Sequence, residues 1–242
     1  MTHSFYEVYI NCLRACRSIG FPYGVNEDAA YMTSWLELHK LEGLKKLSEL
    51  IKKHRKNLKK KIIYNKIKDK KIINLNKATL IYNGPSLFDY FYYKSKNSKT
   101  LKVKLENCID PVFIIPLIKI YSKKFNYIKV FYLTQNKNLN YINAKKNKIL
   151  ISESSNFLKL KKTDVIIEFM IKEKKNNSDL NFFKFKRKID FEDEQKKLCD
   201  SLEPKKIHWN YITKLAKKTF VENNFASKIP KNACTNTATN VK

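Results

Sequence analysis

The chain has 242 residues, of which 43% are hydrophobic, and a formal net charge of +28 at pH 7. This apolar content is too high for a disordered chain, and the length allows one domain with a good core. The longest apolar runs fall short of the roughly 18 residues that a membrane-spanning helix needs, and the first residues do not resemble a signal peptide. We therefore expect a cytoplasmic protein without membrane contact, whose five irregularly spaced cysteines are free thiols.

The positive charge comes from 46 lysines and only 4 arginines, while asparagine and isoleucine each occur 25 times. The codons of these three abundant residues are rich in A and T, and glycine, whose codons are rich in G and C, occurs only 4 times. We interpret the lysine excess as the composition of an AT-rich bacterial genome, because selected phosphate contacts favour the planar fork of arginine. A basic module that binds nucleic acid or an anionic surface is the alternative, with weak, non-specific nucleic-acid binding expected.

Residues 1–61 predict a helical block. Ser4 and Glu7 have the spacing of a capping box, in which each side chain accepts a hydrogen bond from the first turn of a helix. Apolar residues at helical spacing follow, and Gly20 is a suitable residue to end this first helix.

A second and a third helix are expected in the same block. Asn26 is predicted to cap the second helix, whose apolar face includes Trp35, and this places the indole in the core. Gly43 separates this helix from a third, at 44–58. The lysine-rich stretch 59–76 is predicted to be an irregular connection.

Residues 78–190 predict a sheet. The first strand is expected at 79–82, because the turn residues Asn83, Gly84 and Pro85 follow it, and a short aromatic helix should then reach Tyr92. Further strands are expected at 101–105, 127–133, 148–152, 165–171 and 181–189.

One crossover helix is predicted within the sheet region. Asp110 and Pro111 form a helix-start pair, and the apolar run after them reaches Tyr121. Strand, helix and strand across 101–133 therefore predict one crossover unit, whereas the short connections after it favour antiparallel pairing.

A final helix at 204–220 is predicted to close the core, and residues 223–242 lack the apolar spacing needed to dock on it. The predicted fold class is α+β, with an N-terminal helical block, a mixed and mostly antiparallel sheet of five or six strands, one crossover helix and a C-terminal helix. These parts form one domain, 1–222, followed by a poorly ordered tail.

No motif of known chemistry is present in the sequence. The four histidines lack partners at metal-ligand spacing, and the acidic run at 190–194 lacks the spacing of a calcium loop, so no metal site is expected. With 4 glycines, a glycine-rich phosphate-binding loop is nearly excluded. The sequence names no catalytic residue, no cofactor and no oligomeric state.

The N-terminal block resembles an uncharacterised bacterial family, a domain of unknown function typical of alphaproteobacterial genomes. The residues that carry this resemblance are Ser4, Glu7, Arg14–Arg17, Gly20, Tyr23–Ala29, Trp35, Leu36, Gly43 and Leu44. The first helices also resemble, more weakly, the opening of malate and lactate dehydrogenases that do not use a Rossmann fold.

The resemblance extends to the centre and the C-terminal part of the chain. The matching residues are Gly84–Leu87, Asp89, Pro111, Pro116, Trp209, Leu215, Ala216 and Lys218–Val221, with Ser227 near the end. The glycine- and alanine-rich segment that ends the family's proteins is missing from this sequence.

Together, the motifs favour a protein that binds a small molecule, or an enzyme or accessory protein of bacterial metabolism. The candidate ligand-binding residues lie in the helix-turn motifs and at polar positions that match the family. They are Tyr23, Glu27, Asp89, Thr219 and Ser227.

Overall fold

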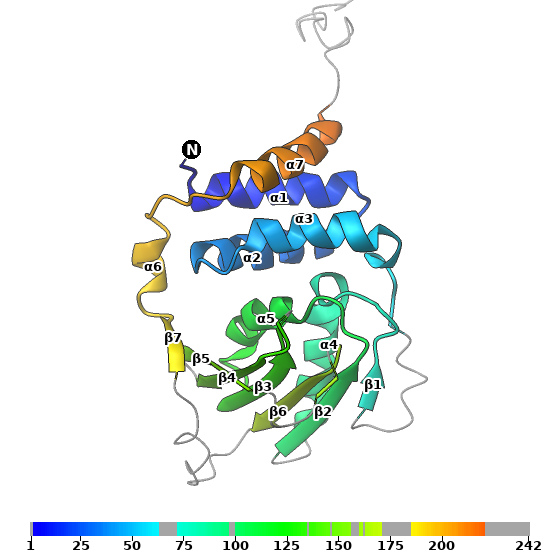
Figure 1. Ribbon diagram of the computed structural model, residues 1–242, viewed down its shortest axis with the longest axis vertical. Coiled ribbons are helices and arrows are strands. Elements are labelled where there is room, and N and C mark those ends of the chain that lie inside the picture. Colours follow the sequence, from blue (N-terminus) through cyan, green and yellow to red (C-terminus); the bar gives the residue numbers. More distant parts are fainter. Residues whose placement is uncertain are drawn as a thin grey trace, which may run out of the picture.

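The computed structural model describes residues 2–62, 72–96, 100–134, 136–145, 147–155, 160–161, 163–170 and 185–220. These residues form an α+β fold, in which a block of helices packs above a mixed sheet (Figure 1). The single-domain division at 222 stays a prediction, and the tail 223–242 and Ser227 lie outside the described residues.

Four helices make the block: α1 (Phe5–Ser18), α2 (Val25–Leu38), α3 (Gly43–His54) and α7 (Lys206–Ala216). Helix α1 packs between α2 and α7, so the first and last helices of the described chain lie side by side (Figure 1). None of the described helices has the length and apolar character that crossing a membrane requires.

The predicted limits of α1 are confirmed. The Ser4 hydroxyl accepts a hydrogen bond from the backbone of Glu7, and the Glu7 carboxylate accepts one from the backbone of Ser4 at 2.7 Å. Gly20 follows the helix with φ +85°, a left-handed conformation that glycine adopts without strain.

The capping role predicted for Asn26 is wrong. Helix α2 starts two residues earlier than predicted, with Gly24 at the N-cap position, and Asn26 is fully buried in its first turn. The local sequence suggested a cap because asparagine is common there, whereas in the structure Asn26 is already a helical residue and is buried.

The sheet has the strand order β1-β2-β6-β3-β4-β5-β7, with one parallel pair, β1 with β2, and antiparallel pairing elsewhere. Its strands are β1 (Ile72–Asn74), β2 (Thr100–Glu106), β3 (Tyr127–Leu133), β4 (Leu139–Lys145), β5 (Lys148–Ser154), β6 (Val165–Met170) and β7 (Phe185–Asp190). Strands β2 and β3 run in the same direction on either side of β6, as a crossover unit requires.

Two parts of the sheet prediction are wrong. Residues 79–82 are not a strand, because they open the long helix α4 (Leu80–Ser95), which continues through Pro85. Strand β1 lies in the stretch predicted to be irregular, and β4 was not predicted, since asparagines interrupt its apolar pattern.

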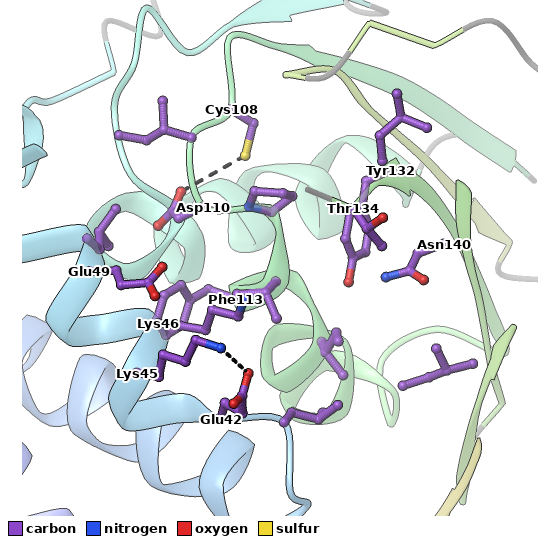
Figure 2. A pocket seen from close by; sticks show the side chains of 18 of the residues that line it. Glu42, Lys45, Lys46, Glu49, Cys108, Asp110, Phe113, Tyr132, Thr134 and Asn140 are labelled. Carbon is purple, nitrogen blue, oxygen red and sulfur yellow. Dashed lines mark hydrogen bonds and ion pairs between the residues drawn. The ribbon is translucent and has the colours of Figure 1, made fainter. Parts of the chain in front are cut away.

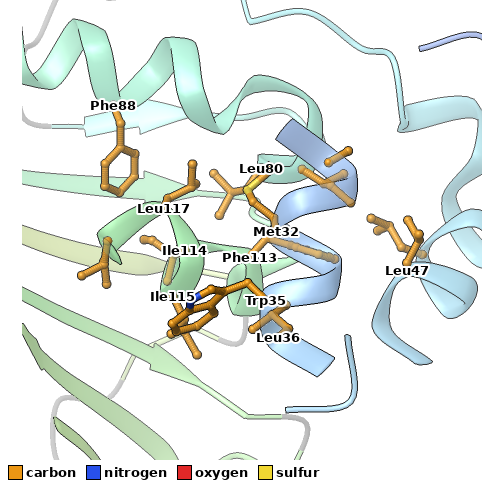
Figure 3. Packing of buried hydrophobic residues seen from close by; sticks show 14 of the residues in the cluster. Met32, Trp35, Leu36, Leu47, Leu80, Phe88, Phe113, Ile114, Ile115 and Leu117 are labelled. Carbon is orange, nitrogen blue, oxygen red and sulfur yellow. The ribbon is translucent and has the colours of Figure 1, made fainter. Parts of the chain in front are cut away.

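The predicted crossover helix is present as a 3₁₀ turn, Pro111–Phe113, followed by α5 (Ile114–Tyr121). Helices α4 and α5 contact both α2 and the sheet, so they form the layer between the helical block and the strands. Trp35 is fully buried in this layer, as predicted, and Figure 3 shows its ring beside Ile115 of α5.

A short helix, α6 (Glu194–Lys197), connects the sheet to α7. The Glu194 carboxylate accepts a hydrogen bond from the Trp35 indole at 2.9 Å and pairs with Lys119 at 2.7 Å. The acidic run at 190–194 thus includes a partly buried ion pair that fastens α6 to α2 and α5.

Candidate functional site

A cavity of about 1070 Å³ lies between α3 and the sheet (Figure 2). One wall is formed by α3 and the turn before it, and the other by the ends of strands β3, β4, β5 and β7. The segment 108–113, which leads into α5, lines it as well. The cavity therefore lies where the helical block meets the sheet, a common place for ligand sites.

The sheet side of the cavity carries neutral polar groups. Tyr132, Thr134 and Asn140 lie on this side, opposite the side chains of α3 (Figure 2). Burial raises the pKa of Tyr132 to about 12, although a hydrogen bond with Asn140 lowers it. The phenol therefore stays protonated at neutral pH and can act as a hydrogen-bond donor.

The α3 side of the cavity carries charged groups. Lys45 pairs with Glu42 at 2.8 Å, and Lys53 approaches Glu49 at 3.9 Å. Hydrogen bonding to Lys45 lowers the pKa of Glu42, which therefore stays ionised in mildly acidic solution. Lys46 is half-buried in the same wall.

Asp110 lines the cavity from the segment before α5. Its carboxylate accepts hydrogen bonds from the backbone N–H groups of Leu80 at 2.8 Å and Ile81 at 3.0 Å, so it caps α4 from a distant part of the chain. Burial raises its pKa to about 6, against the lowering effect of these hydrogen bonds. The Cys108 thiol lies 4.0 Å from the same carboxylate, and burial raises its pKa as well.

Six lysine or arginine side chains and four carboxylates line the cavity. Among the described residues, no carboxylate pairs with Lys40, Lys46 or Arg187. The Arg187 guanidinium instead donates to the backbone carbonyls of His39 at 3.1 Å and Lys40 at 3.4 Å. Within the described residues, three cations at the cavity thus have no carboxylate partner.

Four of the five candidate residues chosen from the sequence lie elsewhere, and the fifth, Ser227, is outside the described residues. Tyr23 is 81% exposed beside the Arg17 guanidinium, and Thr219 donates to the carbonyl of Ala216. Neither these two residues nor Glu27 and Asp89 line the cavity.

Glu27 and Asp89 both lie near Asp28, Glu27 as its neighbour in the sequence and Asp89 through the fold. Both carboxylates help to raise the pKa of Asp28, although burial of Asp28 is the larger cause. Asp89 also pairs with Lys124 at 3.4 Å. In the part of the chain that the structure describes, no group of three or more His, Cys, Asp or Glu side chains could hold a metal ion.

The residues of the cavity were missed because they come from segments far apart in the sequence. One signal was available: Arg187 is one of only 4 arginines in a chain with 46 lysines. In the structure one terminal nitrogen of this arginine, Nη1, donates to two backbone carbonyls.

Comparison with solved structures shows the fold. The chain is similar to a sulfolactate dehydrogenase from Methanocaldococcus jannaschii, with a TM-score of 0.57 and 11% identity over 90% of this chain and 97% of that chain. It is also similar to a dehydrogenase from Sinorhizobium meliloti, with a TM-score of 0.58 and 7% identity over 89% of this chain and 99% of that one. Dehydrogenases are thus among the proteins with a similar fold.

A malate dehydrogenase from Entamoeba histolytica matches 64% of this chain at 12% identity with a TM-score of 0.42, and the chain spans about half (46%) of its length. Among curated protein sequences, none matches this chain. The model of a family described as a protein of unknown function (DUF3726) matches residues 3–106, which confirms the predicted resemblance of the N-terminal block to an uncharacterised family.

Proposed function

We propose that this chain binds a small organic anion in the cavity between α3 and the sheet. The observation that carries the proposal is the set of cations that have no carboxylate partner in the part of the chain that the structure describes, Lys46 above all, because it is half-buried. A confined cation attracts an anion more strongly than a solvated lysine does, since water screens it less.

The opposite wall supports a ligand with further polar atoms. The Tyr132 phenol, the Thr134 hydroxyl and the Asn140 amide offer neutral hydrogen-bonding groups, while the adjacent Phe113 and Leu133 offer apolar contact. A charged group held by α3 and a neutral polar part held by the sheet would together fix the orientation of a small organic acid.

The comparisons support the same class of ligand. The fold is shared with a protein that is named as a dehydrogenase of sulfolactate, which is an organic acid. A role in small-molecule metabolism is therefore part of the proposal.

The first experiment identifies the ligand class. Mass spectrometry of small molecules that remain bound through purification should detect an organic acid. Isothermal titration calorimetry of the purified chain at low salt, with acetate, malonate and inorganic phosphate as probes, should then show saturable binding at one site. The uncharged diamide of malonate should not bind.

Two lysine variants distinguish anion binding in the cavity from attraction by the general positive charge of the chain. Lys46→Met should weaken malonate binding about tenfold, because one charge-assisted hydrogen bond is lost. Lys214→Met removes the same charge from the exposed face of α7, away from the cavity, and should leave the affinity nearly unchanged. Equal losses in both variants, or no saturable binding of any probe, would contradict the proposed function.

A further inference from the structure

Glu42 lies between two lysines, only one of which belongs to the cavity. Its Oε2 atom is 2.8 Å from Lys45 Nζ, and its Oε1 atom is 3.4 Å from Lys205 Nζ. Lys45 lines the cavity, as Figure 2 shows, whereas Lys205 precedes α7 and does not line it. The carboxylate thus has one partner inside the site and one outside.

The side chain of Glu42 does not cap the helix that follows it. It occupies the N-cap position of α3, but its backbone is left-handed, with φ 54°, and its side chain makes no cap hydrogen bond. The carboxylate of Glu37 caps α3 instead, by accepting from the Leu44 N–H at 2.9 Å. The Glu42 carboxylate is therefore available for another role.

The surroundings of Glu42 let its carboxylate move with little change in solvation free energy. Its side chain is 42% exposed, and Lys205 is 70% exposed, so a shift from one lysine to the other buries no charge. The two contacts also differ in length, and the shorter one is the contact inside the cavity.

We infer that Glu42 is a tethered competitor for the anion site: its carboxylate bridges Lys45 and Lys205 in the empty cavity, and it gives up Lys45 and keeps Lys205 when a ligand's anionic group takes its place. This inference rests on the proposed function, because it concerns the same cavity. It also identifies a determinant of specificity. A ligand must carry a group that competes with a carboxylate for Lys45, such as a carboxylate or a phosphate, and a neutral polar molecule does not displace Glu42.

A double-mutant cycle tests the exchange, with malonate and inorganic phosphate as probes in calorimetry at low salt. Glu42→Gln removes the competitor and should raise the affinity about fivefold. Lys205→Met removes the outside partner of the displaced carboxylate and should lower the affinity about twofold. In the double variant, Lys205→Met should have no further effect, because Glu42 is no longer present to be displaced.

Glu49→Gln is the matched control, since Glu49 also lines the cavity but pairs with Lys53, which lines it too. This variant should raise the affinity by reducing the negative charge, yet the effect of Lys205→Met should persist in it.

The proposed exchange is contradicted if Lys205→Met lowers the affinity equally in the parent protein and in the Glu42→Gln variant. Lys205 would then act only through its charge. An unchanged affinity in Glu42→Gln would also overturn the inference, while leaving the proposed function intact. Absence of saturable binding in every variant would overturn both.

Discussion

Trp35 joins three parts of the molecule through one side chain. Its ring is fully buried between α2 and α5, and its indole nitrogen donates to Glu194 of α6. The same carboxylate pairs with Lys119, whose ammonium also donates to the Tyr31 hydroxyl at 2.7 Å. The residue therefore contributes both apolar burial and one end of a polar network.

Trp35→Ala should lower the free energy of unfolding by about 3–5 kcal/mol, because it leaves a large cavity in a packed layer. Trp35→Phe keeps most of the ring and loses the hydrogen bond to Glu194, so a loss of about 2 kcal/mol is expected. Urea denaturation of the three proteins measures both values. Equal stabilities would show that the ring does not pack as described.

The burial of the His39 imidazole makes the stability of the protein depend on pH. It is only 7% exposed at the end of α2, and burial lowers its pKa to about 4, with the nearby cations Lys197, Lys119 and Arg187 adding to the effect. An unfolded histidine binds a proton near pH 6.5, so the unfolded chain takes up more protons than the folded chain between these values. The stability that neutral His39 contributes is therefore present above pH 6.5 and lost as the pH falls to 4.

Neutral His39 is expected to contribute about 3 kcal/mol to the free energy of unfolding, and this contribution is lost between pH 6.5 and 4. His39→Gln should remove it, so that the free energy of unfolding falls less steeply between pH 6.5 and 4 than in the parent protein. The measurement is urea denaturation at half-unit pH steps. Parallel curves for the two proteins would show that His39 can take up a proton in the folded state.

At the scale of elements, the contact of α2 with α3 depends on a glycine. A Cβ atom at Gly43 would collide with the Thr33 carbonyl and lie 2.9 Å from the Glu37 nitrogen, both of them backbone atoms of α2. Helix α3 can therefore start close to α2 only where no side chain stands between them. The sequence indicated Gly43 as a break between helices, but not this close approach.

Gly43→Ala should destabilise the protein by about 3 kcal/mol, since backbone must move to make room. Gly24→Ala is the comparison, because Gly24 has φ +80° but its Cβ would meet no atom within 4 Å. Only the left-handed backbone then contributes, and a loss of about 1 kcal/mol is expected. Thermal unfolding of both variants shows which substitution destabilises the protein more. A larger loss of stability in Gly24→Ala than in Gly43→Ala would contradict this account.

Elements set by neighbouring residues were predicted well, and those set by distant ones were not. The limits of α1 follow from Ser4, Glu7 and Gly20, which are all local signals. The start of α4 depends on Asp110, about thirty residues further on, so the turn residues near Pro85 suggested a different structure. The candidate site depends on the same kind of long-range meeting, because α3, the segment before α5 and four strands build it together.

At the scale of the whole molecule, the charge of +28 remains the most conspicuous property. If the lysines reflect codon composition, binding to duplex DNA should be weak, with a dissociation constant of about 10⁻⁴–10⁻⁶ M at physiological salt, and equal for all sequences. Fluorescence anisotropy with several unrelated duplexes, repeated at rising salt, measures this. Nanomolar binding with a preference for one sequence would instead support the nucleic-acid alternative.

The position of β6 in the sheet has a consequence for how the chain folds. This strand joins two groups of strands, β1 with β2 and β3 with β4, β5 and β7, yet it follows β5 in the sequence. During synthesis, one edge of β2 and one edge of β3 therefore stay without their native neighbour until residue 170 has been made. We expect a rate-limiting step late in synthesis, and a growing chain that is most prone to aggregate just before that point.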